Sequence, residues 1–306
     1  MERHPRFGRY AAAVLAYNLA VIVWGAYVRL TGSGAGCGDH WPTCDGQVIP
    51  RPRDAAMLIE YTHRVTSGLS LALVLGLVAM AFRRYRAGHP ARLGAALSGM
   101  FILTEALLGA GLVLFRLVAH DTSITRAWFH AAHLVNTFAL VAVLTLTAWW
   151  AFGGGALTLA RRGVSFAVLA GIGGTVLLAV TGGIAALGDT LFPARSLAEG
   201  IAQDFNPSAH ILLQLRLWHP VVACAMGLYL LGMVWGVHRA SRAPLTGRLA
   251  TVFSALFSLQ LALGVANVVW LAPAWLQLTH LFVADLVWVT LVLFSAAALA
   301  VPRGED

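Results

Sequence analysis

Eight long apolar stretches dominate this chain and restrict its fold more than any other feature. They lie near residues 10–30, 58–82, 94–115, 127–151, 164–187, 209–236, 249–270 and 276–300. Each approaches the roughly 20 residues that a helix needs to cross a bilayer. Only 11% of the 306 residues are charged, whereas a soluble domain carries about 25%. We therefore predict an all-α integral membrane protein with eight transmembrane helices, surrounded by lipid bilayer.

Clusters of arginine predict the orientation in the membrane. They lie before the first stretch and in alternate loops, at Arg3, Arg6, Arg9, Arg83, Arg84, Arg86, Arg92, Arg161, Arg162, Arg239, Arg242 and Arg248. Positively charged loops remain on the cytoplasmic side, so we expect a multi-pass plasma membrane protein with both termini cytoplasmic. The arginines that produce the net charge of +8 are thus explained by the orientation of the protein in the membrane, so we expect no nucleic-acid partner. The first stretch lacks a small-residue cleavage site, so we expect it to remain as a span.

Four histidines lie near the predicted outer ends of the even-numbered stretches, at His63, His133, His219 and His280. Each is four to ten residues inside its stretch, which is about 6 to 15 Å at 1.5 Å per residue. Ionisable side chains are costly at such depth and usually mark function. Two pairs at matching depths predict two bis-histidine sites of the kind that ligate haem iron from both faces.

A blander interpretation applies to each of these histidines, because a single histidine in a membrane helix often serves only packing or helix–helix hydrogen bonding. His130 also competes with His133, since residues at i and i+3 share one helix face. We favour His133, because a local repeat matches it to His280.

The chain repeats itself about the glycine connector at residues 153–155. Glu105-Ala-Leu-Leu-Gly109 resembles Gln260-Leu-Ala-Leu-Gly264, and Ala132-His133-Leu134 resembles Thr279-His280-Leu281. Four spans per half give both halves the same orientation. We predict two tandem four-helix bundles, residues 1–155 and 156–306, related by a pseudo-two-fold axis along the membrane normal. Each bundle would bind a cofactor between its second and fourth helices.

The halves differ beside their first histidine. Glu60 lies one turn before His63, where the second half has Arg216 before His219. A carboxyl group in that position could exchange protons, so the first half is predicted to be the reactive one. Two simpler roles remain open. Glu60 could only pair with Arg64, and Arg64 and Arg216 could bind haem propionates or only extend toward the membrane surface.

Two cysteines, Cys37 and Cys44, lie in a glycine-rich loop on the predicted outer side. An oxidising exterior permits a disulfide there. Zinc binding with His40 would lack a fourth ligand. The pair could hold a lid over the first site or accept electrons. Cys224, within the sixth span, is expected to be a buried small apolar residue.

The chain resembles the haem A synthases. The matching residues are Thr31-Gly32-Ser33-Gly34, then Cys37 and Cys44 with Trp41-Pro42 between them and Gly46-Gln47 after them, then Glu60-Tyr61-Thr62-His63-Arg64, and one histidine near the start of each later even-numbered span. The resemblance covers nearly the whole chain. His130 departs from the family pattern and leaves the fourth-span ligand open.

This resemblance implies an enzyme that converts haem O to haem A for cytochrome oxidase assembly, oxidising a ring methyl to a formyl group by two hydroxylations and loss of water. It implies a haem b (iron protoporphyrin IX) cofactor at His219 and His280, and substrate haem O at His63 and His133 with Glu60 assisting. It also implies a Cys37–Cys44 disulfide and a farnesylating partner, haem O synthase. An electron donor is required as a further partner, and a homo-oligomer is compatible with the sequence.

Two other classes of function also need histidine pairs or repeated helical halves. One is a di-haem b-type membrane electron carrier, and the other is a haem transporter without redox chemistry. The presence of Glu60 in one half only, together with the cysteine loop, argues against a pure carrier.

Overall fold

The computed structural model describes residues 3–301, and over that part of the chain it confirms an all-helical membrane architecture. Eight segments are long and apolar enough to cross a bilayer. They are α1 (Pro5–Leu30), α2 (Ala55–Arg84), α3 (Pro90–Leu114), α4 (Ile124–Ala151), α5 (Arg162–Leu191), α7 (Ile211–Arg216) continued by α8 (Trp218–Ser241), α9 (Pro244–Val269) and α10 (Ala274–Leu299). The shorter η1 (Ser33–Ala35) and α6 (Leu197–Asp204) lie in the loops; the sequence did not predict α6.

Except for the sixth span, which begins at Ile211, the spanning helices begin two to five residues before the apolar stretches. Polar caps and prolines extend several of them. The side chain of Asp54 accepts a hydrogen bond from the backbone N–H of Met57 at 2.8 Å, and Ser123 caps α4 through the N–H of Arg126 at 3.2 Å. These bonds satisfy first-turn donors that have no partner within the helix. In α1, α3 and α9 a proline occupies the first turn, where its missing N–H costs nothing.

The sixth span is interrupted at Leu217, between α7 and α8. Pro220 lies three residues later and has no backbone N–H, so it cannot bond the carbonyl oxygen of Arg216 as a regular helix requires. Leu217 keeps helical dihedral angles, with φ −57° and ψ −31°. The span therefore continues in nearly the same direction past the break, and His219 lies immediately after it.

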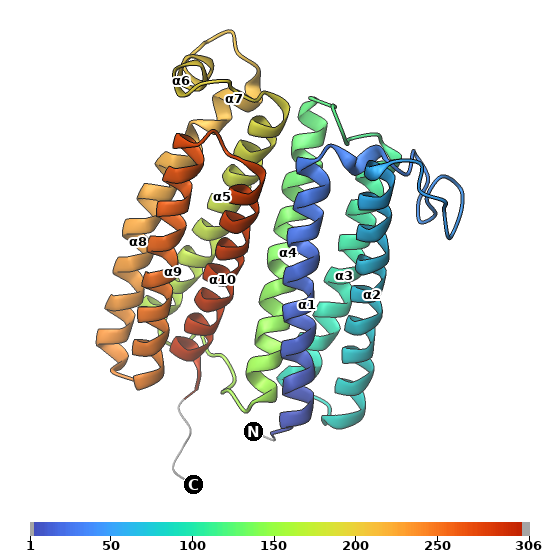
Figure 1. Ribbon diagram of the computed structural model, residues 1–306. Coiled ribbons are helices and arrows are strands. Elements are labelled where there is room, and N and C mark those ends of the chain that lie inside the picture. Colours follow the sequence, from blue (N-terminus) through green and yellow to red (C-terminus); the bar gives the residue numbers. More distant parts are fainter. Residues whose placement is uncertain (1–2, 302–306) are drawn as a thin grey trace.

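The eight spans form two four-helix bundles, which lie side by side in Figure 1. In the N-terminal bundle the neighbours are α1 with α2, α2 with α3, α3 with α4 and α4 with α1. The C-terminal bundle repeats this order with α5, α8, α9 and α10. The second and fourth helices of each bundle therefore lie diagonally across it, and these are the helices that carry the four histidines.

The two bundles meet along α1 and α4 on one side and α5 and α10 on the other. One buried core joins Phe138 and Val141 of α4 to residues of α5, α8, α9 and α10. The indole N–H of Trp288 on α10 donates to the carbonyl oxygen of Phe138 at 2.9 Å. A two-fold rotation that places one bundle on the other moves α1 onto α5 and α4 onto α10. It therefore turns the contact between α1 and α10 into the contact between α5 and α4, and both contacts are present. This pattern is compatible with the predicted pseudo-two-fold axis, which remains a prediction, as do the domain bounds.

One end of the molecule collects the start of α1 and the ends of α4 and α10. The N–H of His4 bonds the carbonyl oxygen of Ala151 at 3.2 Å, and Thr158 N–H bonds that of Leu299 at 2.8 Å. The arginine clusters belong to this end, whereas residues 31–54, α6 and α7 lie at the opposite end (Figure 1). The extreme termini, residues 1–2 and 302–306, fall outside the described residues.

Many large apolar side chains are exposed on the outer surface of the spans, including Leu107 at 65% and Leu228 at 79%. In a membrane this surface contacts lipid tails rather than water. Cys224 also lies on this surface: it is exposed, so the expectation that it is buried was wrong. The face of α8 that carries Cys224 points away from the core of the bundle.

Candidate functional site

The four predicted histidines lie six to nine residues inside their spans, counted from Ala55, Ile124, Ile211 and Ala274. His63 lies on α2 and His133 on α4, and His219 lies on α8 and His280 on α10. The two histidines of each pair therefore belong to the two helices that lie diagonally across one bundle. This is the arrangement in which two helices hold a planar cofactor between them.

A glycine on the preceding span faces each of the four imidazole rings. A methyl group added at Gly25 would lie 3.0 Å from Cε1 of His63, and one at Gly182 would lie 2.9 Å from Cε1 of His219. A methyl group added at Gly109 would lie 3.6 Å from Nε2 of His133, and one added at Gly264 would lie 3.4 Å from Cε1 of His280. The same pairing therefore occurs four times, twice in each bundle. It supports a common origin for the two halves, and the missing side chain lets each ring pack close to the neighbouring helix.

The donor atoms of these pairs fit haem iron. His63 and His280 each have a buried Nδ1 without a hydrogen-bond partner, which is unusual unless the ring has another ligand or a bound molecule to satisfy it. Within residues 3–301, no three side chains of His, Cys, Asp or Glu gather around a common point as they would for a bare metal ion. Two facing imidazoles form the donor set of bis-histidine haem.

His133 is oriented by an acid that the sequence analysis did not single out. Its Nδ1 lies 2.9 Å from Oε1 of Glu105 on α3. Glu105 also accepts hydrogen bonds from Asn136 and Thr137, both on α4. The signal was present, since an acid in the middle of an apolar span is costly and rarely accidental.

The two ligand candidates of the C-terminal bundle have uncharged partners. Nε2 of His280 lies 3.1 Å from the side-chain nitrogen of Gln260 on α9. Nδ1 of His219 lies 3.2 Å from the hydroxyl of Thr181 on α5. Both contacts come from the helix that precedes the histidine, as Glu105 does for His133.

The rings of His130 and His133 point in different directions in the structure. A methyl group added at Gly183 on α5 would lie 3.4 Å from Nε2 of His130, so this ring faces the other bundle. His133 instead faces α3 through Glu105. This difference favours His133 over His130 as the partner of His63.

Glu60 is buried, with 3% of its surface exposed, and it connects α2 to the cysteine loop. Its Oε2 accepts the backbone N–H of Cys37 at 2.8 Å, and its Oε1 pairs with Arg64. Arg64 also donates to the carbonyl oxygens of His40 and Thr43, each at 2.6 Å. The pairing of Glu60 with Arg64, which the sequence left as an alternative, is thus formed, and Arg64 is directed to the loop.

The loop itself is closed by a disulfide between Cys37 and Cys44, which confirms the expected pair and leaves neither sulfur free as a thiolate for zinc. Gly36 lets the loop lie against the first turn of α2, because a methyl group there would be 2.5 Å from the backbone nitrogen of Met57. The hydroxyl of Tyr61 adds a bond to the carbonyl oxygen of Val48 at 3.2 Å. The disulfide loop therefore covers the N-terminal end of α2, the helix that carries His63.

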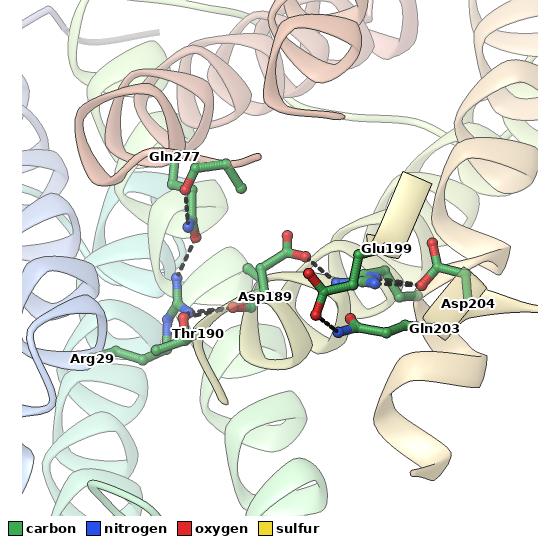
Figure 2. A network of polar contacts seen from close by, with 10 residues as sticks. Arg29, Asp189, Thr190, Glu199, Gln203, Asp204 and Gln277 are labelled. Atoms are coloured by element: carbon green, nitrogen blue, oxygen red, sulfur yellow. Dashed lines mark hydrogen bonds and ion pairs between the residues drawn. The ribbon is translucent and has the colours of Figure 1, made fainter. Parts of the chain in front are cut away.

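Arg216 lies in a polar network at the end of the C-terminal bundle that is opposite the chain termini, and part of this network is drawn in Figure 2. It donates to Asp189 at 2.7 Å and, through Nε, to Asp204 at 2.7 Å. Arg29 of α1 joins the same region from the other bundle, donating to the hydroxyl of Thr190 at 2.6 Å and contacting Gln277 of α10 at 3.4 Å. This network ties the two halves together above the second histidine pair.

One further buried acid had no role in the sequence analysis. Asp285 on α10 is 2% exposed, and its Oδ2 has no hydrogen-bond partner. It lies five residues deeper in the membrane than His280.

The fold and these sites define a multi-pass membrane protein that carries a histidine pair in each of two helical bundles. A model of the COX15-CtaA family, described as cytochrome oxidase assembly protein, matches residues 8–292. The chain therefore belongs to this family of cytochrome oxidase assembly proteins.

Relatives with curated names extend the comparison. Two proteins from different strains of Thermus thermophilus, each named protoheme IX farnesyltransferase, are 46% identical over 295 residues, which is 96% of this chain and 48% of theirs. A heme A synthase of Alkalihalophilus pseudofirmus is 38% identical over 112 residues, covering 37% of this chain and 38% of that protein. A heme A synthase of Halalkalibacterium halodurans is 43% identical over 95 residues, covering 31% and 32%. The chain thus spans about half the length of its Thermus relatives.

Proposed function

We propose that this protein is a haem A synthase, which oxidises a ring methyl of haem O to the formyl group of haem A. The observation that carries the proposal is the pair of histidines on the diagonal helices of each bundle, each ring opposed by a glycine. Two such sites suit one substrate haem and one resident haem. The family and the relatives named heme A synthase support the same reaction class.

The two bundles would divide the work. We assign haem b to His219 and His280, and substrate haem O to His63 and His133. Bound haem b supplies reversible one-electron redox chemistry. The assignment is supported by the distribution of acids, since Glu105 contacts His133 and Glu60 lies one turn before His63 on α2, whereas Thr181 and Gln260 contact the C-terminal pair.

The protein's own residues would position the substrate and control protons. The buried carboxylate of Glu60 would accept or return a proton near His63 during methyl oxidation, with Arg64 and the N–H of Cys37 holding it in place. The disulfide loop, anchored to Arg64 and Tyr61, would limit water at the outer end of the site. Neither Arg64 nor Arg216 is free in the structure, so binding of haem propionates would require each to exchange a present partner.

The test is to co-express the chain with a haem O-producing enzyme and to measure the masses of extracted haems. A synthase yields the formyl product, and substitution of His63 or His133 by alanine abolishes it. An electron carrier would give a haem b spectrum without formyl haem. A transporter would move haem across vesicles with its mass unchanged, and either result would refute the proposal.

We also infer that the chain works beside a haem-farnesylating enzyme. The Thermus proteins carry that activity in their names, and this chain matches only 48% of their length. A region similar to this chain is thus joined there to a second region in one polypeptide. Co-purification of this chain with haem O synthase would test whether the contact also forms between separate chains. We expect the two proteins to purify together at low salt and to separate in detergent at high salt.

For the orientation, we propose that the arginine-rich end, where α1 begins and α10 ends, faces the cytoplasm of the plasma membrane. Single cysteines introduced at Arg86 and at Asp39 would report it. An impermeant maleimide applied to intact cells should label the second and spare the first. The reverse labelling would overturn the orientation.

A further inference from the structure

The two bundles place different side chains at one equivalent position. Glu105 on α3 and Gln260 on α9 each lie four residues before a glycine that faces a histidine, Gly109 and Gly264. Each of the two side chains also contacts that histidine: Glu105 reaches His133, and Gln260 reaches His280. The duplicated position therefore contacts a histidine in both halves, but it is acidic in one and neutral in the other.

The surroundings of Glu105 suit a carboxylate. Three side-chain donors converge on it: the Nδ1–H of His133 at 2.9 Å, the amide of Asn136 and the hydroxyl of Thr137. An ionised carboxyl group only accepts hydrogen bonds, and bonds to a charged acceptor are about twice as strong as neutral ones. Asn136 is itself held by the carbonyl oxygen of Phe101 at 2.9 Å. The acid is thus fixed by packing as well as by its donors.

This contact determines which nitrogen of His133 is free. A carboxylate requires a proton on Nδ1, so the lone pair of the neutral ring lies on Nε2. In metal sites such a carboxylate–histidine pair fixes ring orientation and makes the imidazole a stronger donor to the metal.

The equivalent contact in the C-terminal bundle does not determine which nitrogen of His280 carries the proton. The amide nitrogen of Gln260 lies beside Nε2 of His280, and Nδ1 of His280 has no partner. A glutamine carries no charge and can donate or accept, so it neither fixes the tautomer nor adds electron density to the ring.

We propose that Glu105 is a positioning residue that makes the N-terminal iron site electronically different from the C-terminal one. It does so by holding His133 as an Nε2 ligand with an anionic partner. The inference rests on the proposed function, because it requires that His133 ligate iron. Since negative charge near the iron favours the ferric state, the N-terminal site should have the lower reduction potential where the bound haem is the same.

A reciprocal exchange tests this proposal. The N-terminal site is studied alone in the full-length chain carrying His280→Ala, and the C-terminal site alone in the chain carrying His133→Ala, each titrated with haem b. Glu105→Gln should raise the midpoint potential of the first site, and Gln260→Glu should lower that of the second. Glu105→Ala should also weaken haem b binding to the first site about 10- to 100-fold.

The controls distinguish a positioning role from a structural one. Ser98→Ala removes a buried hydroxyl on the same helix as Glu105 that donates to the carbonyl oxygen of Gly94, and it should leave the potential unchanged. If Glu105→Gln lowers thermal stability without moving the potential, the residue is only structural and the inference is overturned. If the His280→Ala chain binds no haem b at all, the proposed N-terminal site itself is wrong. Should Glu105→Ala fail to fold, the potential of the isosteric Glu105→Gln chain still decides.

Discussion

The backbone N–H of Cys37 donates to Oε2 of Glu60 over 2.8 Å, so the disulfide loop is fastened to the helix that carries His63. Arg64 completes the connection by pairing with Glu60 and donating to two loop carbonyl oxygens. A carboxylate that both holds a lid and lies one turn from a candidate iron ligand is placed to serve structure and proton transfer together.

Glu60→Gln separates these two roles. The single amide oxygen can still accept from Cys37, although the bonds from Arg64 to the second carboxylate oxygen are lost. The side chain can no longer take a proton, so we expect haem to bind while product formation falls. Extracted haem should then contain haem O or a hydroxylated intermediate, measured by mass. The control is Asp39→Asn in the same loop, whose side chain is about half exposed and pairs with Arg116, and which should leave the product unchanged. Normal amounts of haem A from Glu60→Gln would show that its carboxyl group has no role in the chemistry.

The glycines that face the histidines offer a steric test. Gly182→Ala would place a methyl group 2.9 Å from Cε1 of His219, closer than packed carbon atoms approach, so the ring must move away from Thr181. We expect a reduced low-spin haem b signal from the C-terminal bundle, measured by reduced-minus-oxidised absorption spectra. Gly173→Ala on the same helix meets nothing within 4 Å and should preserve the signal. Equal loss in both variants would point to helix destabilisation rather than to the contact.

The spans and the histidine positions could be predicted because their signals are local. An apolar run of about 20 residues determines a span wherever it lies, and the repeat Glu105–Gly109 with Gln260–Gly264 matched residues that the structure also places alike. The direction of His130 could not be predicted, because residues at i and i+3 share a face and only the packing of α5 shows which ring turns toward it.

The contacts of the acids and arginines depend on tertiary packing and were missed for that reason. Arg29 meets Gln277 across 248 residues of sequence, and Glu105 meets His133 only because α3 packs on α4. Pro220 is a local sequence feature that could have indicated the break at Leu217. A proline near the start of a span is equally compatible with an intact first turn, however, so the break could not be predicted. The roles of the site residues remain predictions that the experiments above address.

Arg29 should contribute strongly to the union of the two bundles. Its guanidinium group donates to the carbonyl oxygen of Ala186 at 2.7 Å and to the hydroxyl of Thr190 at 2.6 Å, and bonds from a charged donor contribute about 1.5–3 kcal/mol each. We expect Arg29→Met to lower the thermal unfolding midpoint in detergent by an amount equivalent to about 3 kcal/mol or more. Arg195→Gln, an exposed arginine at the same end, should change stability by no more than about 0.5 kcal/mol. Equal midpoints for the two variants would exclude Arg29 as a bridge between the bundles.

Trp288 provides a second, purely neutral bridge, located deep in the membrane. Its N–H donates to the carbonyl oxygen of Phe138 at 2.9 Å, and the two rings are 4.9 Å apart between centroids. Trp288→Phe keeps an aromatic ring but removes the donor, so we expect a loss of about 1 kcal/mol, with further loss where the smaller ring leaves space. The matched change Trp275→Phe affects an indole that is 59% exposed at the membrane boundary and should be nearly neutral. Chemical or thermal unfolding of both variants, followed by intrinsic fluorescence, measures the difference. If Trp288→Phe were as stable as the unmodified chain, the apolar contacts of α4 with α5 and α10 would suffice to hold the bundles together without this hydrogen bond.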